Sequence, residues 1–397
     1  MAMSGILSRV RSIDAFRAVT MFLMIFVNDI DSMPNTPGWL HHAGETADAL
    51  GLADTIFPAF LFIVGLSIPF AFQNRLNRGH HHQIPWRVIT RSLSLVFIGF
   101  YHANMETYNE ATAILPKPVW ESLVTISFFF IFLDYSSEKI KIRRYIFQGI
   151  GIVLLIGMSV LYKTNAPGYT WLHFSWWGIL GLIGWSYLVC ALIYYYSDGY
   201  LWVQAAAWIF FMFFNIDFHY GWFDFLSPVQ KYVWIAGNGA MQSFTMAGIF
   251  VAVLYMRLSA SKEIKLLGIG MLLMAVILFN LGFITRYFGG GISKANDTPS
   301  WVLICTGISL VVYCLFIFMV DFKHKYKWFK VIEPAGTNAF TCYLVPFIFY
   351  PLYQMSNIGY PEYLSQGAGG LIKGLVFAFA MVWLTGLLEK INIRLKI

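Results

Sequence analysis

Long apolar runs recur along the whole chain and are separated by short polar segments. An α-helix needs about 20 mostly apolar residues to cross the hydrocarbon of a bilayer, and a helix bonds its own backbone groups there. The pattern predicts an all-α polytopic membrane protein with about twelve transmembrane helices (10–12), forming one domain over residues 1–397. The predicted spans are residues 14–33, 52–72, 87–103, 119–134, 144–162, 176–196, 200–216, 238–257, 264–284, 300–320, 335–353 and 368–388.

Composition supports this interpretation. Hydrophobic residues make up 58% of the 397 residues and charged residues only 12%, whereas a soluble domain carries roughly 25% charge. So few charges cannot solvate a globule of this size. The four cysteines all lie within apolar runs and show no CxxC spacing, so we expect them to be small buried side chains and predict no redox or metal role.

The basic residues are distributed unevenly between the two predicted faces of the membrane. With the N-terminus inside, the inner segments hold 21 lysines and arginines and the outer ones hold 6, so the positive-inside rule places both termini in the cytoplasm. Adding the acidic residues gives net charges of +13 inside and −6 outside. Topology therefore explains the net charge of +7 without a nucleic-acid partner. The inner face favours anionic ligands and the outer face cationic or amine-bearing ones.

Candidate chemistry is concentrated in the first two predicted spans and the loop between them, residues 11–72. Asn28 lies at the outer end of the first span, His41 and His42 follow in the loop, and Asp54 opens the second span. Ionisable residues at a membrane span are functional candidates because their burial is costly. A histidine beside a carboxylate is also a common general base. From these residue types alone, a solvated loop histidine and a catalytic histidine both remain open.

This hairpin resembles the start of the heparan-α-glucosaminide N-acetyltransferase family of transmembrane acyltransferases over about 60 residues. The matching residues are Arg11 to Arg17, Phe26-Val27-Asn28, His42-Ala43, Ala53-Asp54, Phe57-Pro58, Phe60, Phe62-Ile63, Gly65 and Ser67-Ile68. Weaker matches follow at Arg91-Ser92-Leu93, at Lys294 with Thr298-Pro299-Ser300-Trp301, and at Gly336-Thr337-Asn338-Ala339. The family's Pro-Gly-Val-Leu-Gln-Arg segment is replaced here by Pro118-Val119-Trp120-Glu121-Ser122.

The resemblance implies roles for individual residues. It makes His42 the catalytic histidine, with Asp54 orienting its imidazole and Asn28 donating a hydrogen bond to the developing oxyanion. The loop from Asn28 to His42 is longer than usual for the family, so His41 stays as the alternative catalytic residue. Further residues are expected to bind the acyl donor or line its site: Arg17, Arg87, Arg91, Lys294 and Asn338.

The activity implied is transfer of an acetyl group from cytosolic acetyl-CoA to the amine of a terminal amino sugar outside the membrane. An O-acetyltransferase of a surface polysaccharide and a secondary transporter are the alternatives, since both would share this topology. Direct transfer and a relay through an acetylated histidine both fit a catalytic His42. A homodimer is common in the family. The absence of the animal enzymes' luminal domain and of a signal peptide favours a bacterial plasma (inner) membrane.

Two further polar clusters have simpler explanations than a functional site. His80, His81 and His82 lie in a basic inner loop, and consecutive loop histidines do not make a closed coordination shell, so no metal site is predicted. Asp217, His219 and Asp224 form a second outer cluster, for which we expect a solvated loop rather than substrate contact.

Overall fold

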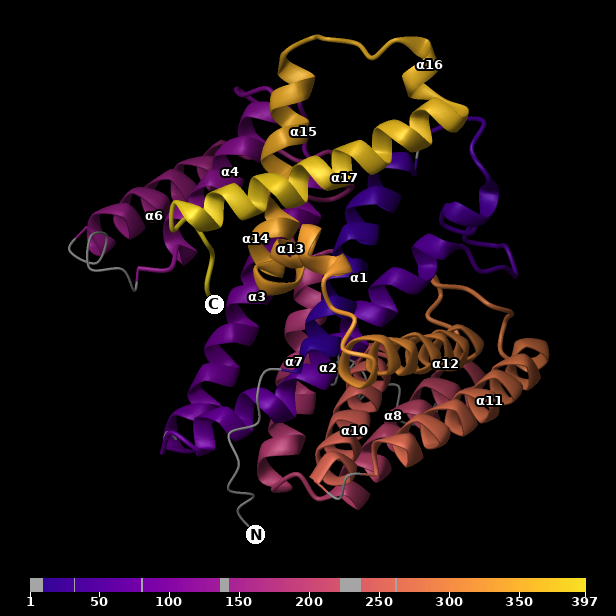
Figure 1. Cartoon of the computed structure of the whole chain (residues 1–397). Helices are drawn as coiled ribbons and strands as arrows, with labels where there is room; N and C mark the ends of the chain where they lie inside the picture. Colours follow the sequence, from indigo (N-terminus) through magenta and orange to yellow (C-terminus); the bar gives the residue numbers. More distant parts are fainter. Residues whose placement is uncertain (1–9, 32, 80, 136–142, 222–236, 261–262) are drawn as a thin grey trace.

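The computed structural model describes residues 10–31, 33–79, 81–135, 143–221, 237–260 and 263–397 (Figure 1). In these segments the ordered elements are helical, and the only β pairing is two isolated bridges, Tyr108 with Thr164 and Leu133 with Leu395. The all-α prediction is therefore confirmed. The main helices are α1 (Arg11–Ile30), α2 (Leu52–Leu76), α3 (Ile84–Glu106), α4 (Lys117–Phe132), α6 (Arg144–Leu161), α7 (Gly178–Tyr196), α8 (Leu201–Tyr220), α10 (Ala240–Ala260), α11 (Ile264–Phe288), α12 (Pro299–Phe316) and α17 (Gly367–Lys390).

Each predicted span falls on a helical segment of the described chain. Eight helices there are long and apolar enough to cross a membrane by length and composition, which supports a polytopic membrane protein. Of the remaining predicted spans, α4 has only 16 residues, while α1 and α3 carry charged side chains such as Asp14 and Arg87. The orientation of the termini stays a prediction.

The predicted span at residues 335–353 is the one that differs most. It is broken into α13 (Glu333–Thr337), α14 (Ala339–Leu344) and α15 (Pro346–Met355). Asn338 has φ −124° and ψ 44°, outside the helical region, and separates the first two pieces. Proline lacks the N–H that would continue the helical bonding, so Pro346 begins a new piece. Broken helices of this kind are tolerated where they are buried in protein or line a cavity.

Helix α1 lies at the centre of the fold and packs against α2, α12, α13 and α17 (Figure 1). Helix α2 crosses α10 at very short range. A Cβ on Gly65 would lie 2.0 Å from the carbonyl oxygen of Thr245, and one on Gly248 would lie 2.0 Å from that of Phe62. Glycine at both positions lets the two backbones meet directly. The second predicted span is thereby fixed against a helix from the other half of the chain.

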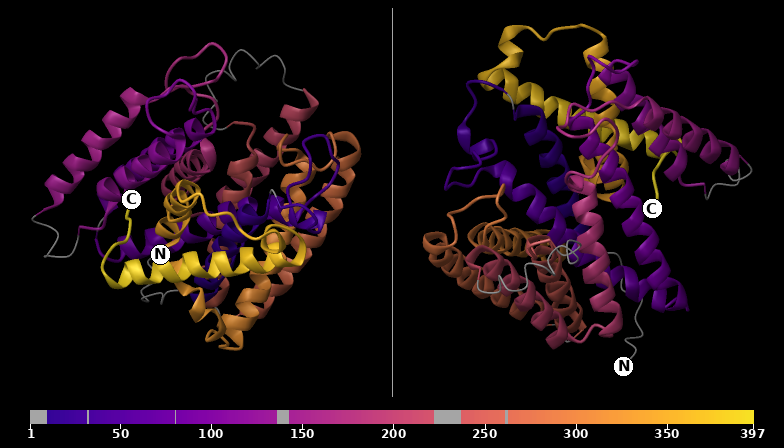
Figure 2. Two further views of the ribbon diagram at one scale, coloured as in Figure 1. Left: turned by 90° about the horizontal axis from the view of Figure 1, so that it is seen from above. Right: turned by 180° about the vertical axis from the view of Figure 1, so that it is seen from behind.

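Two segments far apart in the sequence lie side by side at one edge of the molecule. The loop between α1 and α2 and the loop of residues 289–298 between α11 and α12 meet there, in the front view and in the view from behind (Figures 1 and 2). Backbone N–H of Ala49 donates to the carbonyl oxygen of Ile292 at 3.2 Å. This edge holds His42 and Asp54.

Candidate active site

Asp54 is held in one orientation at the start of α2. Its side chain is 2% exposed. One carboxylate oxygen, Oδ2, accepts the backbone N–H groups of Ala43 at 2.9 Å and Gly51 at 3.0 Å. Its backbone carbonyl accepts the indole N–H of Trp301 at 3.1 Å. These bonds leave the other carboxylate oxygen, Oδ1, directed at the loop.

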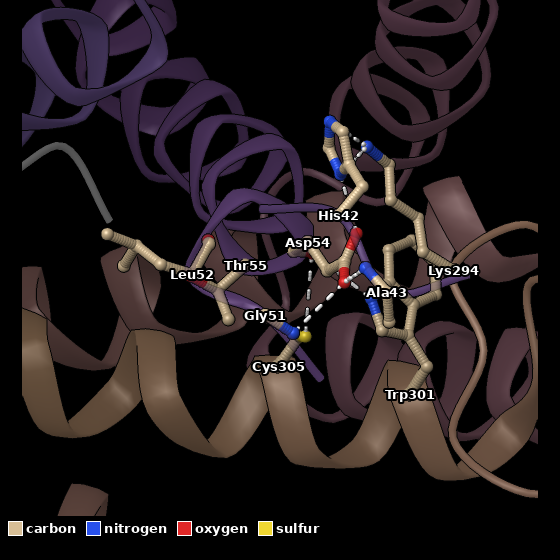
Figure 3. Close-up of polar contacts among 9 residues, drawn as sticks. All are labelled: His42, Ala43, Gly51, Leu52, Asp54, Thr55, Lys294, Trp301 and Cys305. Atoms are coloured by element: carbon tan, nitrogen blue, oxygen red, sulfur yellow. Dashed lines mark hydrogen bonds and ion pairs between the residues drawn. The ribbon is translucent and has the colours of Figure 1, made fainter. Parts of the chain in front are cut away.

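His42 completes a histidine–aspartate pair with that oxygen. Its Nδ1 lies 2.7 Å from Oδ1 of Asp54 (Figure 3). The imidazole is 36% exposed, while the carboxylate is 2% exposed. Since an ionised carboxylate can only accept, Nδ1–H of His42 donates to it and the Nε2 lone pair is left available. A buried carboxylate that fixes the tautomer of a more exposed imidazole is the arrangement that general-base catalysis needs.

His41 is directed elsewhere. Its Nε2 lies 2.5 Å from the hydroxyl oxygen of Thr36, and its Nδ1 is buried without a hydrogen-bond partner in the described part of the chain. The structure therefore pairs His42, not His41, with Asp54. The catalytic role of either histidine stays a prediction.

Gly51 allows the loop to fold onto the start of α2. A Cβ at this position would lie 1.8 Å from the carbonyl oxygen of His41. Only glycine permits so close an approach while its own N–H bonds to Asp54. The contact holds the backbone of His41 against the start of α2, beside the carboxylate that pairs with His42.

Lys294 reaches the same pair from the loop between α11 and α12. Its Nζ lies 3.2 Å from Nδ1 and 3.5 Å from Nε2 of His42 (Figure 3). Burial lowers the pKa of Lys294 from its ordinary value, against the opposing effects of nearby carboxylates, with Asp54 first among them. The sequence resemblance indicated Lys294 as a residue lining the acyl-donor site. The structure places its Nζ beside the imidazole of His42, and the donor-site role stays a prediction.

Several bonds fasten the two loops together beside this site. Asp48 accepts the guanidinium Nε–H of Arg286 at 2.8 Å and the backbone N–H of Ile292 at 2.7 Å. These bonds lower the pKa of Asp48 from its ordinary value, the bond from Ile292 having the largest effect. On the other side of the loop, the amide of Asn296 donates to the carbonyl oxygen of Glu45 at 3.3 Å.

Helix α8 also bonds to the loop of residues 289–298, a contact that the sequence did not predict. Asn215 donates to the carbonyl oxygen of Asp297 at 3.0 Å, and Nε2–H of His219 donates to that of Asn296 at 2.8 Å. Asn238 donates to Oδ2 of Asp297 at 3.1 Å. Burial raises the pKa of Asp297 to about 6. We call Asn215, His219, Asn238 and Asp297 the loop anchor.

The loop anchor corrects one expectation. Asp217 and His219 were expected in a solvated loop, but both lie in the last turns of α8 and Asp217 is 6% exposed. The spacing of Asn215 and His219, four residues apart, could have indicated this contact, because it puts both side chains on one face of a helix. Asp224 lies outside the described residues.

Asn28 stands apart from the histidine–aspartate pair. It is exposed near the outer end of α1, and no hydrogen bond joins it to His42 or Asp54 in the described structure. Its neighbour Asp29 is engaged by Lys373 at 3.4 Å and by the hydroxyl of Tyr350 at 3.1 Å. The expected oxyanion role of Asn28 stays a prediction.

Three of the residues expected to bind the acyl donor line one cavity, which lies on the predicted inner side. The cavity has a volume of about 370 Å³ and includes Arg17, Arg91 and Asn338. Arg17 donates to Ser67 at 2.6 Å and to the carbonyl oxygen of Gly336 at 3.1 Å. Most of the other lining residues are apolar, which is typical of small-molecule sites with a few oriented polar groups.

Arg91 and Arg87 differ in their relation to this cavity. The Arg91 guanidinium lies 5.0 Å above the ring of Tyr187, and both residues line the cavity. Arg87 is exposed, donates to Gln83 at 3.3 Å and is not among the lining residues. The structure therefore brings Arg91, and not Arg87, into the candidate binding space.

Metal ligands were not predicted. Within the described segments, no group of three or more histidine, cysteine, aspartate or glutamate side chains is arranged to hold a metal ion. His80 of the histidine run lies outside those segments.

Comparison with known proteins assigns the chain to a family. The family described as "Domain of unknown function (DUF5009)" matches residues 9–219, which is more than half of the chain. The chain belongs to this family. The DUF5009 match includes Asn28, His42 and Asp54, whereas Lys294 and the cavity residue Asn338 lie beyond it.

Two curated proteins are also similar to parts of this DUF5009 chain. Heparan-alpha-glucosaminide N-acetyltransferase of Homo sapiens is 34% identical over 104 residues, which are 26% of this chain and 15% of that protein. The Mus musculus protein of the same name is 32% identical over 98 residues, which are 24% of this chain and 14% of that protein. The similarity thus spans a small part of each relative, and it supports the family resemblance identified from the first hairpin.

Proposed function

We propose that this protein is a transmembrane acetyltransferase that moves an acetyl group from cytosolic acetyl-CoA to the amine of a terminal amino sugar on the outer side. The observation that carries the proposal is the pair of His42 and Asp54, with Nδ1 2.7 Å from Oδ1. The names of the two similar proteins support N-acetyl transfer as the class of reaction. The cavity lined by Arg17 and Arg91 supports an anionic donor.

The chemistry follows from Nε2 of His42, because the bond to Asp54 uses Nδ1. As the acceptor nitrogen attacks the thioester carbonyl carbon, Nε2 takes its proton. The carbon–sulfur bond then breaks, and the proton passes to the leaving thiolate of CoA. Asp54 would stabilise the imidazolium that exists between these steps. In a two-step version, Nε2 bonds to the thioester carbonyl carbon and the carbon–sulfur bond breaks, which releases the CoA thiolate. The acceptor amine then bonds to the acetyl carbon, the bond from that carbon to Nε2 breaks, and the proton lost by the amine neutralises the thiolate.

The two regions lie at different depths along α2. Ser67 lines the cavity, and Asp54 is 13 residues earlier on the same helix, a separation of about 20 Å at the helical rise. One face of α2 carries cavity residues along this distance, namely Phe60, Val64 and Ser67. A donor bound at its phosphates on the inner side would therefore need its long, flexible pantetheine arm to extend toward the pair.

Release of CoA tests this proposal. Purified protein in lipid nanodiscs would be given acetyl-CoA with glucosamine-terminated acceptors, and free thiol would be measured together with the acetylated sugar. We expect His42→Ala to lower kcat by about 10³-fold or more, since it removes the base or nucleophile. His41→Ala is the matched control and should keep kcat within about tenfold.

Several results would count against the proposal. Full activity in His42→Ala with loss in His41→Ala would reverse the assignment of the histidines. Acetylation of hydroxyl-only acceptors would indicate an O-acetyltransferase. Sugar uptake into proteoliposomes without thiol release would indicate a transporter.

A further inference from the structure

Lys294 is the cationic side chain that contacts the histidine–aspartate pair in the described structure. Its Nζ lies 3.2 Å from Nδ1 and 3.5 Å from Nε2 of His42. No carboxylate of the described residues lies within 4.0 Å of this ammonium group. In this fold, lysines such as Lys373 and Lys396 pair directly with aspartates. Lys294 thus brings a positive charge to the imidazole and not to an acid.

The distances leave the ammonium able to bind a further group. The Nδ1 proton is committed to Asp54, so only Nε2 can accept from Lys294, and a separation of 3.5 Å is too long for a strong hydrogen bond. An ammonium has three N–H donors. Donors that are not used by the protein can therefore turn toward an incoming carbonyl oxygen.

The same geometry defines where a reacting carbonyl would lie. Nε2 takes the proton of the attacking nitrogen. The thioester carbonyl carbon must therefore lie about 3 Å from that nitrogen, and the carbonyl oxygen about 3 Å from an oxyanion donor. Since Nζ and Nε2 are 3.5 Å apart, a thioester carbonyl can contact both at once. Asn28, the other candidate donor, has no bond to the pair.

We propose that Lys294 is a catalytic residue of the acetyl transfer, donating to the oxyanion that forms on the thioester carbonyl oxygen. This inference rests on the proposed function and adds a residue to that site. When the acceptor nitrogen bonds to the carbonyl carbon, the C=O π pair moves to oxygen and Nε2 takes the amine proton. When this electron pair re-forms the C=O bond, the carbon–sulfur bond breaks and His42 gives the proton to the thiolate. Lys294 keeps its proton throughout.

The loop anchor supports this role because an oxyanion donor must be held in place before the reaction. Residues on both sides of Lys294 are fixed: Ile292 by Asp48, Asn296 by His219 and Asp297 by Asn215 and Asn238. The bonds come from three separate segments of the chain. Lys294 itself is half-buried, so water screens its charge less than at the surface.

The test is Lys294→Met in the full-length protein, with initial rates of CoA release and direct titration of CoA. We expect kcat to fall about 100-fold, the usual cost of removing one oxyanion donor. The Kd for CoA should change less than about threefold, since CoA lacks the thioester carbonyl. Lys163→Met is the matched control because Lys163 is an exposed outer-side lysine; its kcat should stay at the wild-type value.

Chemical rescue separates chemistry from folding. Lys294→Cys would be alkylated with 2-bromoethylamine, which restores a side chain of lysine's length ending in an ammonium group. We expect at least tenfold recovery of kcat, and none in treated wild type, whose cysteines are buried or half-buried. Wild-type kcat in Lys294→Met, a raised Kd for CoA with unchanged kcat, or no rescue would each overturn the role of Lys294. If wild-type protein itself releases no CoA with any amine, the proposed function fails first.

Discussion

The pair of His42 and Asp54, on the predicted outer side, and the cavity of Arg17 and Arg91, on the predicted inner side, are built in opposite ways; we call them the outer and the inner region. Around His42 and Asp54, the polar groups are fastened by named hydrogen bonds from two loops, and Asp54 alone accepts three of them. The inner cavity is formed by helix faces with mostly apolar side chains, and its cations line it at a few positions such as Arg17 and Arg91. The outer region holds the side chains of His42 and Asp54 in fixed positions. The inner region provides a cavity with positive charge at its wall.

That difference predicts two kinds of mutational effect. A reaction centre depends on geometry, so small displacements near His42 should lower kcat. A charged cavity holds a ligand through attractions that are each modest, so substitutions near Arg91 should raise KM and leave kcat nearly unchanged.

Asp54→Asn should have the largest effect. The amide keeps the shape of the carboxylate but loses its charge and can no longer hold the Nδ1–H tautomer of His42 in the same way. We expect kcat for CoA release to fall on the order of 10³-fold with the KM for acetyl-CoA changed less than about threefold. An unchanged kcat together with a lowered melting temperature would show that Asp54 serves only to hold the loop through Ala43 and Gly51.

Gly51→Ala should be the next largest. Its methyl group would lie 1.8 Å from the carbonyl oxygen of His41, so the loop must move away from α2 and carry His42 with it. We expect kcat to fall about 100-fold, since a displacement of about 1 Å costs that much at a reaction centre. Gly44→Ala is the control, because a Cβ there meets only Ala47 at 3.9 Å. Equal losses in both variants would contradict a special role for Gly51.

Arg91→Gln tests the inner region. Removing one cation from the cavity should raise the KM for acetyl-CoA about tenfold, while kcat changes less than about twofold. Arg87→Gln should have a smaller effect, since Arg87 does not line the cavity, and Arg78→Gln in the exposed turn after α2 should have none. A tenfold fall in kcat for Arg91→Gln would break the proposed division between the two regions.

Asp297→Asn should have the smallest effect, visible as a pH dependence of stability. The pKa of Asp297 is raised to about 6, so the folded protein holds this proton more tightly than the unfolded chain. The stability that the protonated Asp297 contributes to the folded state is present at low pH and is lost as the pH rises through about 6. Asparagine cannot ionise, so the variant should melt about 2 °C above wild type at pH 7.5, with the difference shrinking toward pH 5. A difference independent of pH would contradict burial of an ionisable Asp297.

Much of the fold could be predicted from the sequence because apolar runs of spanning length leave few alternatives in a bilayer. Even the short run at residues 119–134 and the pair joined by Ser197-Asp198-Gly199 are helices, α4, α7 and α8. The break at Asn338 was not predicted. Its neighbours Thr337 and Ala339 are compatible with a helix, and the interruption depends on packing against α1 and α17.

The candidate site was predictable only in part. The resemblance indicated His42 and Asp54, but only the fold of the loop shows that His42 meets Asp54 while His41 bonds Thr36. The position of Lys294 could not be inferred from local pattern, since 252 residues separate it from His42. Contacts at such separation are set by how α2 crosses α10 and α12, and side-chain periodicity along one helix carries no information about that crossing.

The bonds of Asp48 to Arg286 and Ile292 join two loops that are synthesised far apart in time. His42 and Asp54 are synthesised early, with the first hairpin, but the loop of residues 289–298 that lies beside them follows only after α11. A nascent chain therefore carries the histidine–aspartate pair for most of its synthesis without the loop that holds Lys294 beside it. We expect activity to begin only after the loop between α11 and α12 has been made, so a chain that ends before this loop would not release CoA.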